Sequence, residues 1–123
     1  MDVAVKEKIK VRDALKRYIT PLTGDEFNQL EANILEEGCR DPLIVWKNGN
    51  EFILLDGHNR YRICKKHHIH FEVEEKSFND EETARLWMIN NQLGRRNLNA
   101  YQLSYYRGLK YLEEKKQKEG MNM

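Results

Sequence analysis

The sequence at residues 55–64 reads Leu-Asp-Gly-His-Asn-Arg-Tyr-Arg-Ile-Cys and follows an apolar run that begins at Phe52. This pattern predicts a strand that ends near Asp56 and a helix that starts directly after Gly57. A glycine at such a turn lets the backbone bend tightly and lets an anion come close. The helix start offers unpaired N–H groups and the positive end of a dipole, and Arg60 and Arg62 add charge nearby. The stretch therefore predicts a site for a phosphate or carboxylate group, without fixing a reaction.

The residues around this stretch predict further helices and a hairpin. Thr23 and Glu26 have the spacing of a capping box, and Gly38 is placed to end the helix that they start. Asn48-Gly49 is a two-residue turn typical of a β-hairpin. The expected elements, in chain order, are a helix at 23–38, strands at 43–46 and 51–55, a helix from 57 to about 68, a strand at 71–74, and helices from Asn79 to Gly94 and from Asn99 onward.

This order predicts an α+β fold with a small mixed sheet that contains a hairpin and is packed by helices, followed by a helical C-terminal part. The 123 residues suit one domain. We place it at residues 23–112, after an N-terminal arm at 1–22 that forms a helical turn near Asp13. A charged tail at 113–123 is expected to fray.

Composition narrows the function classes. The formal net charge is +1, so the overall charge predicts neither a nucleic-acid nor a membrane partner, and any such prediction depends on local clusters. The sequence contains no run of about 18 apolar residues, as a membrane-spanning helix would need. Two cysteines, Cys39 and Cys64, do not make a disulfide framework. We expect a cytoplasmic protein with reduced thiols.

A second polar cluster lies at residues 91–99, between the last two expected helices. It combines amides, which donate and accept hydrogen bonds, with Arg95 and Arg96, whose planar guanidinium groups fit phosphate. An interhelical turn that Gly94 begins and Asn99 caps explains part of this composition. It does not explain Gln92 together with the two arginines, so a functional role and a plain turn both stay open.

The helix after Gly57 allows other interpretations. An ordinary amphipathic helix with a basic outer face is one of them. A zinc site is another, because Cys64 and three histidines (His67, His68 and His70) are close in sequence, but their spacing matches no common structural zinc site. Cys64 falls on the apolar side of the helix, where a cysteine usually behaves as a small hydrophobic residue rather than a nucleophile. No metal ligands are therefore assigned.

Three segments together resemble the amino-terminal domain of ParB, the chromosome and plasmid partition protein, which has the ParB/sulfiredoxin fold. Residues 41–45 resemble the family's Gln-Pro-Ile-x-Val strand. Residues 57–63 resemble its Gly-Glu-Arg-Arg-x-Arg-Ala motif, and residues 91–99 resemble its Glu-Asn-x-Gln-Arg-x-x-Leu-x motif. The resemblance covers more than half of the chain, from about Arg40 to Leu112.

In that family the last two motifs face each other and hold the triphosphate of CTP with magnesium. The resemblance therefore implies that two turns of this chain converge on one pocket for CTP or another nucleotide with Mg²⁺. The implied phosphate-binding residues are Gly57, His58, Asn59, Arg60, Arg62, Asn91, Gln92, Arg95 and Arg96. The chain departs from the family pattern where His58 and Asn91 replace glutamates, Asn59 replaces an arginine, and Gly94 replaces a glutamine.

The resemblance implies a DNA-associated protein of the partition or transcription-regulation type with a nucleotide-binding pocket. DNA is the expected partner, and a homodimer stays open. One alternative is a scaffold that binds the DNA backbone without a ligand. Another is a metal-dependent ParB-like nuclease with Asp56 as the metal-binding carboxylate and His58 as the acid or base. An enzymatic role, as a CTPase or a nuclease, is left undecided.

Overall fold

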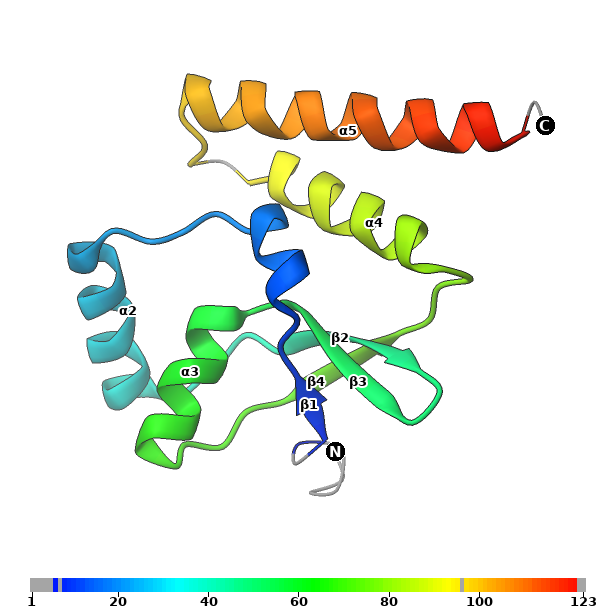
Figure 1. Ribbon diagram of the computed structural model, residues 1–123. Helices are drawn as coiled ribbons and strands as arrows, with labels where there is room; N and C mark the ends of the chain where they lie inside the picture. The colour runs from blue at the N-terminus through cyan, green and yellow to red at the C-terminus, as the bar shows by residue number, and fades with distance from the viewer. Residues whose placement is uncertain (1–5, 7, 96, 122–123) are drawn as a thin grey trace. The chain divides into compact units, whose positions relative to one another are not determined.

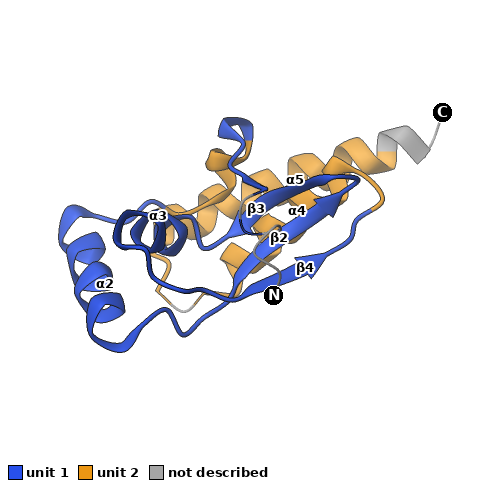
Figure 2. Ribbon diagram, turned by 90° about the horizontal axis from the view of Figure 1, so that it is seen from below, with its two compact units in different colours: residues 1–14, 21–78 blue, residues 15–20, 79–123 orange. Residues whose placement is uncertain are grey.

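The structure is a computed structural model that describes residues 6, 8–95 and 97–121 (Figure 1). It divides into two compact units, each built from separated parts of the chain (Figure 2). Residues 1–14 and 21–78 form the first unit, and residues 15–20 and 79–123 form the second. A mixed sheet of four strands combined with helices confirms the predicted α+β fold class.

The first unit is built around the sheet, whose strand order is β1-β3-β2-β4. Strands β2 (Leu43–Asn48) and β3 (Glu51–Asp56) form the predicted antiparallel hairpin, and Gly49 in its turn has a positive φ of 62°. β1 (Ile9–Lys10) pairs in parallel with β3, and β4 (Val73–Lys76) pairs in parallel with β2. The hairpin therefore forms the centre of the sheet, and β3 leads directly into the glycine turn.

Helices α2 (Gly24–Glu37) and α3 (His58–His67) pack together in the same unit. Thr23 caps α2 with the predicted capping box, and Gly38 ends it. Side chains from one face of the hairpin and from both helices share an apolar core, as the alternation of a strand requires. Its buried members are Ile9, Ile34, Leu43, Val45, Phe52, Leu54, Ile63, Cys64, Phe71 and Val73.

The second unit joins a short 3₁₀ helix to two long helices. The 3₁₀ helix is η1 (Asp13–Tyr18), of which residues 15–18 belong to this unit. Helices α4 (Glu81–Leu93) and α5 (Ala100–Met121) pack against each other. The Tyr105 hydroxyl donates a hydrogen bond of 3.0 Å to the Arg17 carbonyl, which ties α5 to η1.

Three local differences separate the structure from the sequence-based expectations. Strand β4 begins at Val73 rather than at Phe71. Asp80 rather than Asn79 caps α4, because its carboxylate accepts hydrogen bonds from both the backbone and the hydroxyl of Thr83. Helix α5 continues to Met121, through the residues that were expected to fray.

This longer helix has a physical cause in Glu113, which is 3% exposed. Its carboxylate accepts a hydrogen bond of 3.1 Å from Arg85 Nε on α4 and one of 3.5 Å from the Tyr18 hydroxyl on η1. The charged composition of the segment suggested solvent exposure, but a paired buried carboxylate holds this turn of α5 in place. Within the described part of the chain, none of the helices is both long and apolar enough to cross a membrane.

Candidate phosphate-binding site

The turn between β3 and α3 accepts only glycine without strain. Gly57 has φ 98° and ψ 27°, in the left-handed region. A Cβ atom at this position would lie 2.5 Å from Leu43 Cδ2 and 2.9 Å from Arg60 Nη2. Two independent constraints, the dihedral angle and the lack of space, therefore require the glycine that the sequence singled out.

The start of α3 differs chemically from the other helix starts. No side chain caps it, and its first turn contains no acidic residue. By contrast, side chains cap α2 and α4, and Asn99 and Gln102 form the predicted capping box at the start of α5. The first N–H groups of α3 therefore lack the side-chain acceptor that the other helices provide, and the helix dipole makes their surroundings positive.

Arg60 is held beside this helix start. Its Nη2 donates a hydrogen bond of 3.0 Å to the Pro42 carbonyl and lies 3.7 Å from Asp56 Oδ2. The Nε atom is buried and has no hydrogen-bond partner among the residues that the structure describes. Because Pro42 and Asp56 fix the guanidinium, Arg60 presents its charge in a more constant orientation than a freely rotating surface arginine would.

The residues on either side of Gly57 are half-buried. Asp56 is the carboxylate beside Arg60, and His58 begins α3 with both ring nitrogens buried. Asn59 follows on the same turn and is also half-buried. These three residues and Arg60 therefore lie around the same turn, beside Gly57.

Three of the remaining basic residues of α3 contact α2, whereas Lys65 lies over the Tyr61 ring of α3 itself. The Arg62 guanidinium lies over the Phe27 ring at 4.8 Å from its centroid. Lys66 Nζ and His67 Nε2 lie 3.1 Å and 2.9 Å from the same Glu31 carboxylate oxygen. Hydrogen bonds from His67 and then Lys66 hold the pKa of Glu31 below its usual value. Arg62 therefore does not share the surroundings of Arg60, although the motif resemblance groups both as phosphate-binding residues.

Cys64 behaves as the sequence predicted. It is 1% exposed, and burial, with a smaller effect from Cys39, raises the pKa of its thiol to about 12. A thiol with this pKa stays protonated at neutral pH and is a poor nucleophile. Among the described residues there is also no group of three or more His, Cys, Asp or Glu side chains that could hold a metal ion.

In the second unit, the turn after α4 contains the other predicted cluster. Gln92 is 1% exposed, and its Oε1 accepts hydrogen bonds from Thr20 Oγ1 at 2.7 Å and from Arg95 Nη1 at 3.4 Å. Thr20 Oγ1 also lies 3.0 Å from the hydroxyl of Tyr106, whose pKa is raised by burial. Asn91 is half-buried and Arg95 is exposed, whereas Arg96 lies outside the described residues.

This network gives Gln92 a role that sequence reasoning missed. Its side-chain oxygen joins Thr20, Tyr106 and Arg95, so Gln92 positions its neighbours. The sequence did not indicate Thr20 as a partner of Gln92, because the two residues are 72 positions apart. The Pro42 carbonyl was also missed, although the 41–45 segment that contains it had been recognised. Its resemblance suggested a strand and gave no reason to connect it with Arg60.

No protein-family model matches the sequence, and neither does any curated protein. Solved structures do match. The Pnob8-like ParB-N domain aligns with a TM-score of 0.76 and 22% identity, over 96% of this chain and 46% of that one. The C-terminally truncated chromosome-partitioning protein ParB from Caulobacter crescentus, complexed with CTP-γ-S, aligns with a TM-score of 0.59 and 16% identity, over 76% of this chain and 53% of that one. The chain therefore spans about half the length of each.

Proposed function

The chain has a ParB N-terminal-like fold, and from that premise we propose that it is a binding module for the phosphate groups of a nucleotide. The start of α3 receives a phosphate group, and the bound state controls association with DNA. One observation carries the proposal: α3 begins without a side-chain cap and without an acid in its first turn. An anion supplies the acceptors that these N–H groups lack.

Gly57 and Arg60 support the same proposal from two directions. Because Gly57 has no Cβ, the Leu43 side chain and the Arg60 guanidinium can lie close to the backbone of this turn. Arg60 supplies a permanent positive charge in a fixed orientation. A charge-assisted hydrogen bond contributes about 1.5–3 kcal/mol. Micromolar affinity corresponds to about −8 kcal/mol, so Arg60 has to act together with the N–H groups and with further charged donors in a preorganised site.

The turn after α4 is the proposed second half of the site. Arg95, Asn91 and Arg96 carry its donors, while Gln92 acts through Arg95 rather than on the ligand, because its own oxygen is already bonded. This assignment follows the motif resemblance at residues 91–99. It requires both turns to reach the same ligand.

A nucleoside triphosphate fits the donor set of the first half, since N–H groups and a guanidinium match phosphate oxygens. CTP is the first candidate, because one structural neighbour was solved with CTP-γ-S. Asp56 is the residue that would help to hold Mg²⁺, an ion that takes most of its ligands from phosphates and water. When bound, the ion would neutralise phosphate charge. Asp56 also restrains Arg60, so both groups would face the same ligand.

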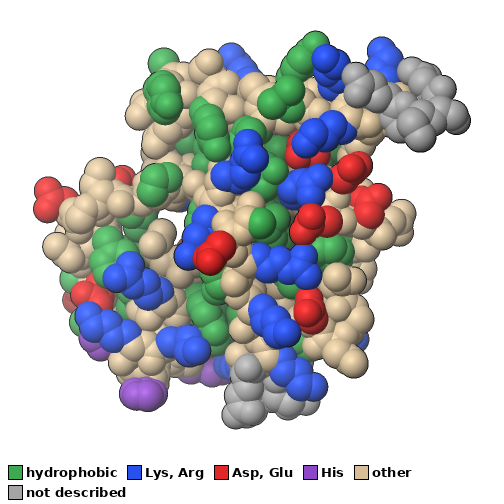
Figure 3. Space-filling model, viewed as in Figure 1, with side chains coloured by type: hydrophobic (Ala, Val, Ile, Leu, Met, Phe, Trp, Pro, Cys, Tyr) green, Lys and Arg blue, Asp and Glu red, His purple; other side chains and the backbone are tan. Residues whose placement is uncertain are grey.

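The ligand-free scaffold is less well supported. Phosphate contacts along a DNA backbone need accessible cations. On α3, however, Arg62 stacks on Phe27, and Lys66 and His67 pair with Glu31. On the face shown in Figure 3, acidic side chains also lie among the Lys and Arg side chains. The nuclease alternative would depend on Asp56, which already faces Arg60.

Thermal unfolding with nucleotide tests the proposal. We expect millimolar CTP with Mg²⁺ to raise the melting temperature of the chain, and inorganic triphosphate to raise it less. Arg60→Gln removes the charge and is expected to weaken binding by ~10–100-fold, in line with the loss of one charge-assisted contact. ATP and GTP, each with and without magnesium, determine the base and metal preference.

Arg40→Gln is the matched control for the Arg60 variant. Arg40 belongs to the same unit, its side chain is 75% exposed, and it pairs with Glu37 away from the glycine turn. It should bind nucleotide like the parent chain. The absence of any shift with all three nucleotides, or equal losses in the two variants, contradicts the proposal. Binding to a DNA fragment, measured with and without nucleotide, then shows whether the two partners are coupled.

A further inference from the structure

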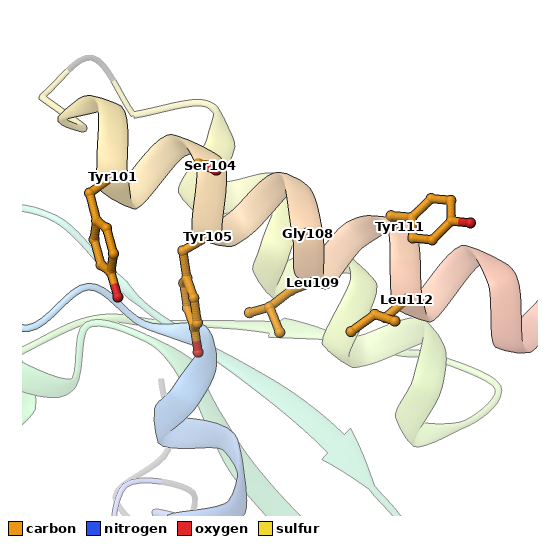
Figure 4. Close-up of a pocket in the computed structure, with 7 residues that line it drawn as sticks. All are labelled: Tyr101, Ser104, Tyr105, Gly108, Leu109, Tyr111 and Leu112. Atoms are coloured by element: carbon orange, nitrogen blue, oxygen red, sulfur yellow. The ribbon is translucent and has the colours of Figure 1, made fainter.

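The two cysteines of the chain belong to the first unit and have no part in the proposed phosphate site. They differ in this respect from the residues of a shallow groove of about 530 Å³ along α5, all of which lie on that helix (Figure 4). None of the groove residues is charged or carries a thiol, and the hydroxyl of one of them, Tyr105, already donates a hydrogen bond to the Arg17 carbonyl of η1. The cysteines are therefore the reactive side chains whose chemistry remains to be assigned.

Both cysteines contribute to the same apolar core. Cys64, on α3, is one of its buried members, and Cys39 packs against this core from the segment that follows α2. The two thiols also interact directly. After burial, the charge of Cys39 and its side-chain hydrogen bond are the next causes of the raised pKa of the Cys64 thiol. Two thiols held beside each other in this way can join when the segments that carry them approach slightly.

The two thiols differ in accessibility. Cys64 is 1% exposed and protonated at neutral pH, so it is a poor first nucleophile. Cys39 is only half-buried, and its thiol donates a hydrogen bond of 3.6 Å to the Asp41 carbonyl in its own segment. A small oxidant therefore reaches Cys39 first and finds a second thiol directly behind it. An accessible thiol next to a resolving cysteine is the usual arrangement of a site of reversible oxidation.

From this arrangement we propose that Cys39 and Cys64 form an oxidation site, at which a hydroperoxide converts the two thiols into an intramolecular disulfide. In the first step the Cys39 sulfur attacks a peroxide oxygen, the O–O bond breaks, and the other oxygen leaves with the thiol proton, as water or an alcohol. Cys39 is then a sulfenic acid. In the second step the Cys64 sulfur attacks the Cys39 sulfur, the S–O bond breaks, and hydroxide leaves as water with the Cys64 proton. The two thiols thus give two electrons to the peroxide.

Oxidation of Cys39 prepares Cys64 for the second step. Burial remains the main cause of the raised pKa of Cys64, so the second step is the slower one. A sulfenic acid, however, removes the repulsion by a Cys39 thiolate, which is the next cause. The positive charge of Arg60 continues to favour the Cys64 thiolate. A thiol that is unreactive in the reduced chain thereby becomes reactive once its neighbour is oxidised.

The disulfide also acts on the phosphate site, an effect that rests on the proposed function. Residues 38–42 form neither helix nor strand, and the Pro42 carbonyl at their end accepts the hydrogen bond from Arg60. Arg60 and Cys64 lie one turn apart on the same side of α3. Because an S–S bond is only about 2.05 Å long, its formation draws residues 38–42 towards α3 and shifts Pro42 relative to the Arg60 guanidinium. We therefore expect oxidation to weaken nucleotide binding.

Intact-mass spectrometry tests the disulfide without any nucleotide. The full chain is treated with hydrogen peroxide and then with an alkylating reagent under denaturing conditions. We expect the parent chain to lose two hydrogen atoms, to take up no reagent, and to regain both thiols with dithiothreitol. A parent chain that keeps both thiols overturns the proposal, and so does one that is linked to a second chain through Cys39.

Two single variants test the order of the steps. Cys64→Ala lacks the resolving thiol, so Cys39 should accumulate as a sulfenic acid that dimedone labels. Cys39→Ser, a conservative change at a half-buried position, should fold, as circular dichroism will verify, and its buried Cys64 should stay reduced. Equal dimedone labelling of the parent chain and Cys64→Ala overturns the role of Cys64. Oxidation of Cys64 in Cys39→Ser overturns the role of Cys39.

The affinity of the reduced and the oxidised parent chain for CTP with Mg²⁺ tests the effect on Arg60. We expect the oxidised chain to bind more weakly, by up to the ~10–100-fold that corresponds to one charge-assisted contact, and dithiothreitol to restore binding. Peroxide-treated Cys39→Ser is the control and should bind like its untreated form. Equal affinities of the two parent states overturn this effect. If neither state binds nucleotide, the proposed function fails, whereas the disulfide stands or falls on the mass measurement alone.

Discussion

At the scale of single residues, Gly57 carries the most information. The sequence identified it from its position between an apolar strand and a basic helix. The structure adds the contact with Leu43 and Arg60, which no sequence pattern reports. Replacing Gly57 would introduce both backbone strain from the left-handed dihedral angle and a steric clash. A comparison of Gly49, in the hairpin turn, with Gly57, after β3, separates these two costs experimentally.

Gly49→Ala measures the first contribution alone. Gly49 has φ 62° and open space around an added Cβ, so the substitution is expected to lower the free energy of unfolding by about 1–2 kcal/mol through the dihedral strain. Gly57→Ala adds the clash with Leu43 Cδ2 and should cost ~1–3 kcal/mol more. Urea unfolding of both variants measures the difference. Equal losses would mean that the turn relaxes and that the contact contributes nothing.

At the scale of elements, the pairing of α2 with α3 depends on charge as well as on the apolar core. Glu31 on α2 receives hydrogen bonds from His67 and Lys66 on α3, and its pKa is lowered by them. A carboxylate with a lowered pKa in the folded state stabilises the fold above its unfolded pKa. That contribution disappears as the pH falls through the folded pKa.

Glu31→Gln should therefore lower the melting temperature at neutral pH, and its effect should shrink as the pH falls through the lowered pKa of Glu31, where the parent carboxylate becomes protonated. Glu36→Gln, an exposed position on the same helix, is the control and should show no such convergence. Parallel curves of melting temperature against pH for the parent and Glu31→Gln would contradict this role of Glu31.

The same scale shows what the sequence could and could not predict. The capping boxes at Thr23 and Asn99, the hairpin turn and the helix after Gly57 were predicted because each depends on residues close together in sequence. The cap of α4 was assigned one residue early, because Asn79 and Asp80 are both good caps. The directions of Arg60 and Arg62 required tertiary contacts, with Pro42 for one and Phe27 for the other.

At the scale of the whole molecule, distant parts of the chain make each unit. Tyr18 and Glu113 are 95 positions apart and hydrogen-bonded, and Arg85 completes this group. Composition alone suggested that residues after Leu112 are solvent-exposed, because they are mostly charged. The burial of Glu113 depends on partners that no local pattern connects with it.

Glu113→Ala would leave Arg85, whose side chain is 17% exposed, without its buried partner. Removing one member of such a pair typically costs about 3–5 kcal/mol. We expect faster amide hydrogen exchange throughout α4 and α5 of the second unit. Glu114→Ala, one residue further along α5 and exposed, is the control and should exchange like the parent chain. Unchanged protection in Glu113→Ala would show that the carboxylate does not stabilise these helices.

The bond between Thr20 and Gln92 also has a consequence for synthesis of the chain. Thr20 leaves the ribosome 72 residues before its partner Gln92, and Tyr18 leaves it 95 residues before Glu113. A contact of such long range closes late, so the second unit cannot form before Glu113 has emerged. For the same reason, an expression fragment that begins at residue 79 would lack the polar partners of α4 and α5. Grafting these two helices onto another protein would require residues 15–20 to be carried with them.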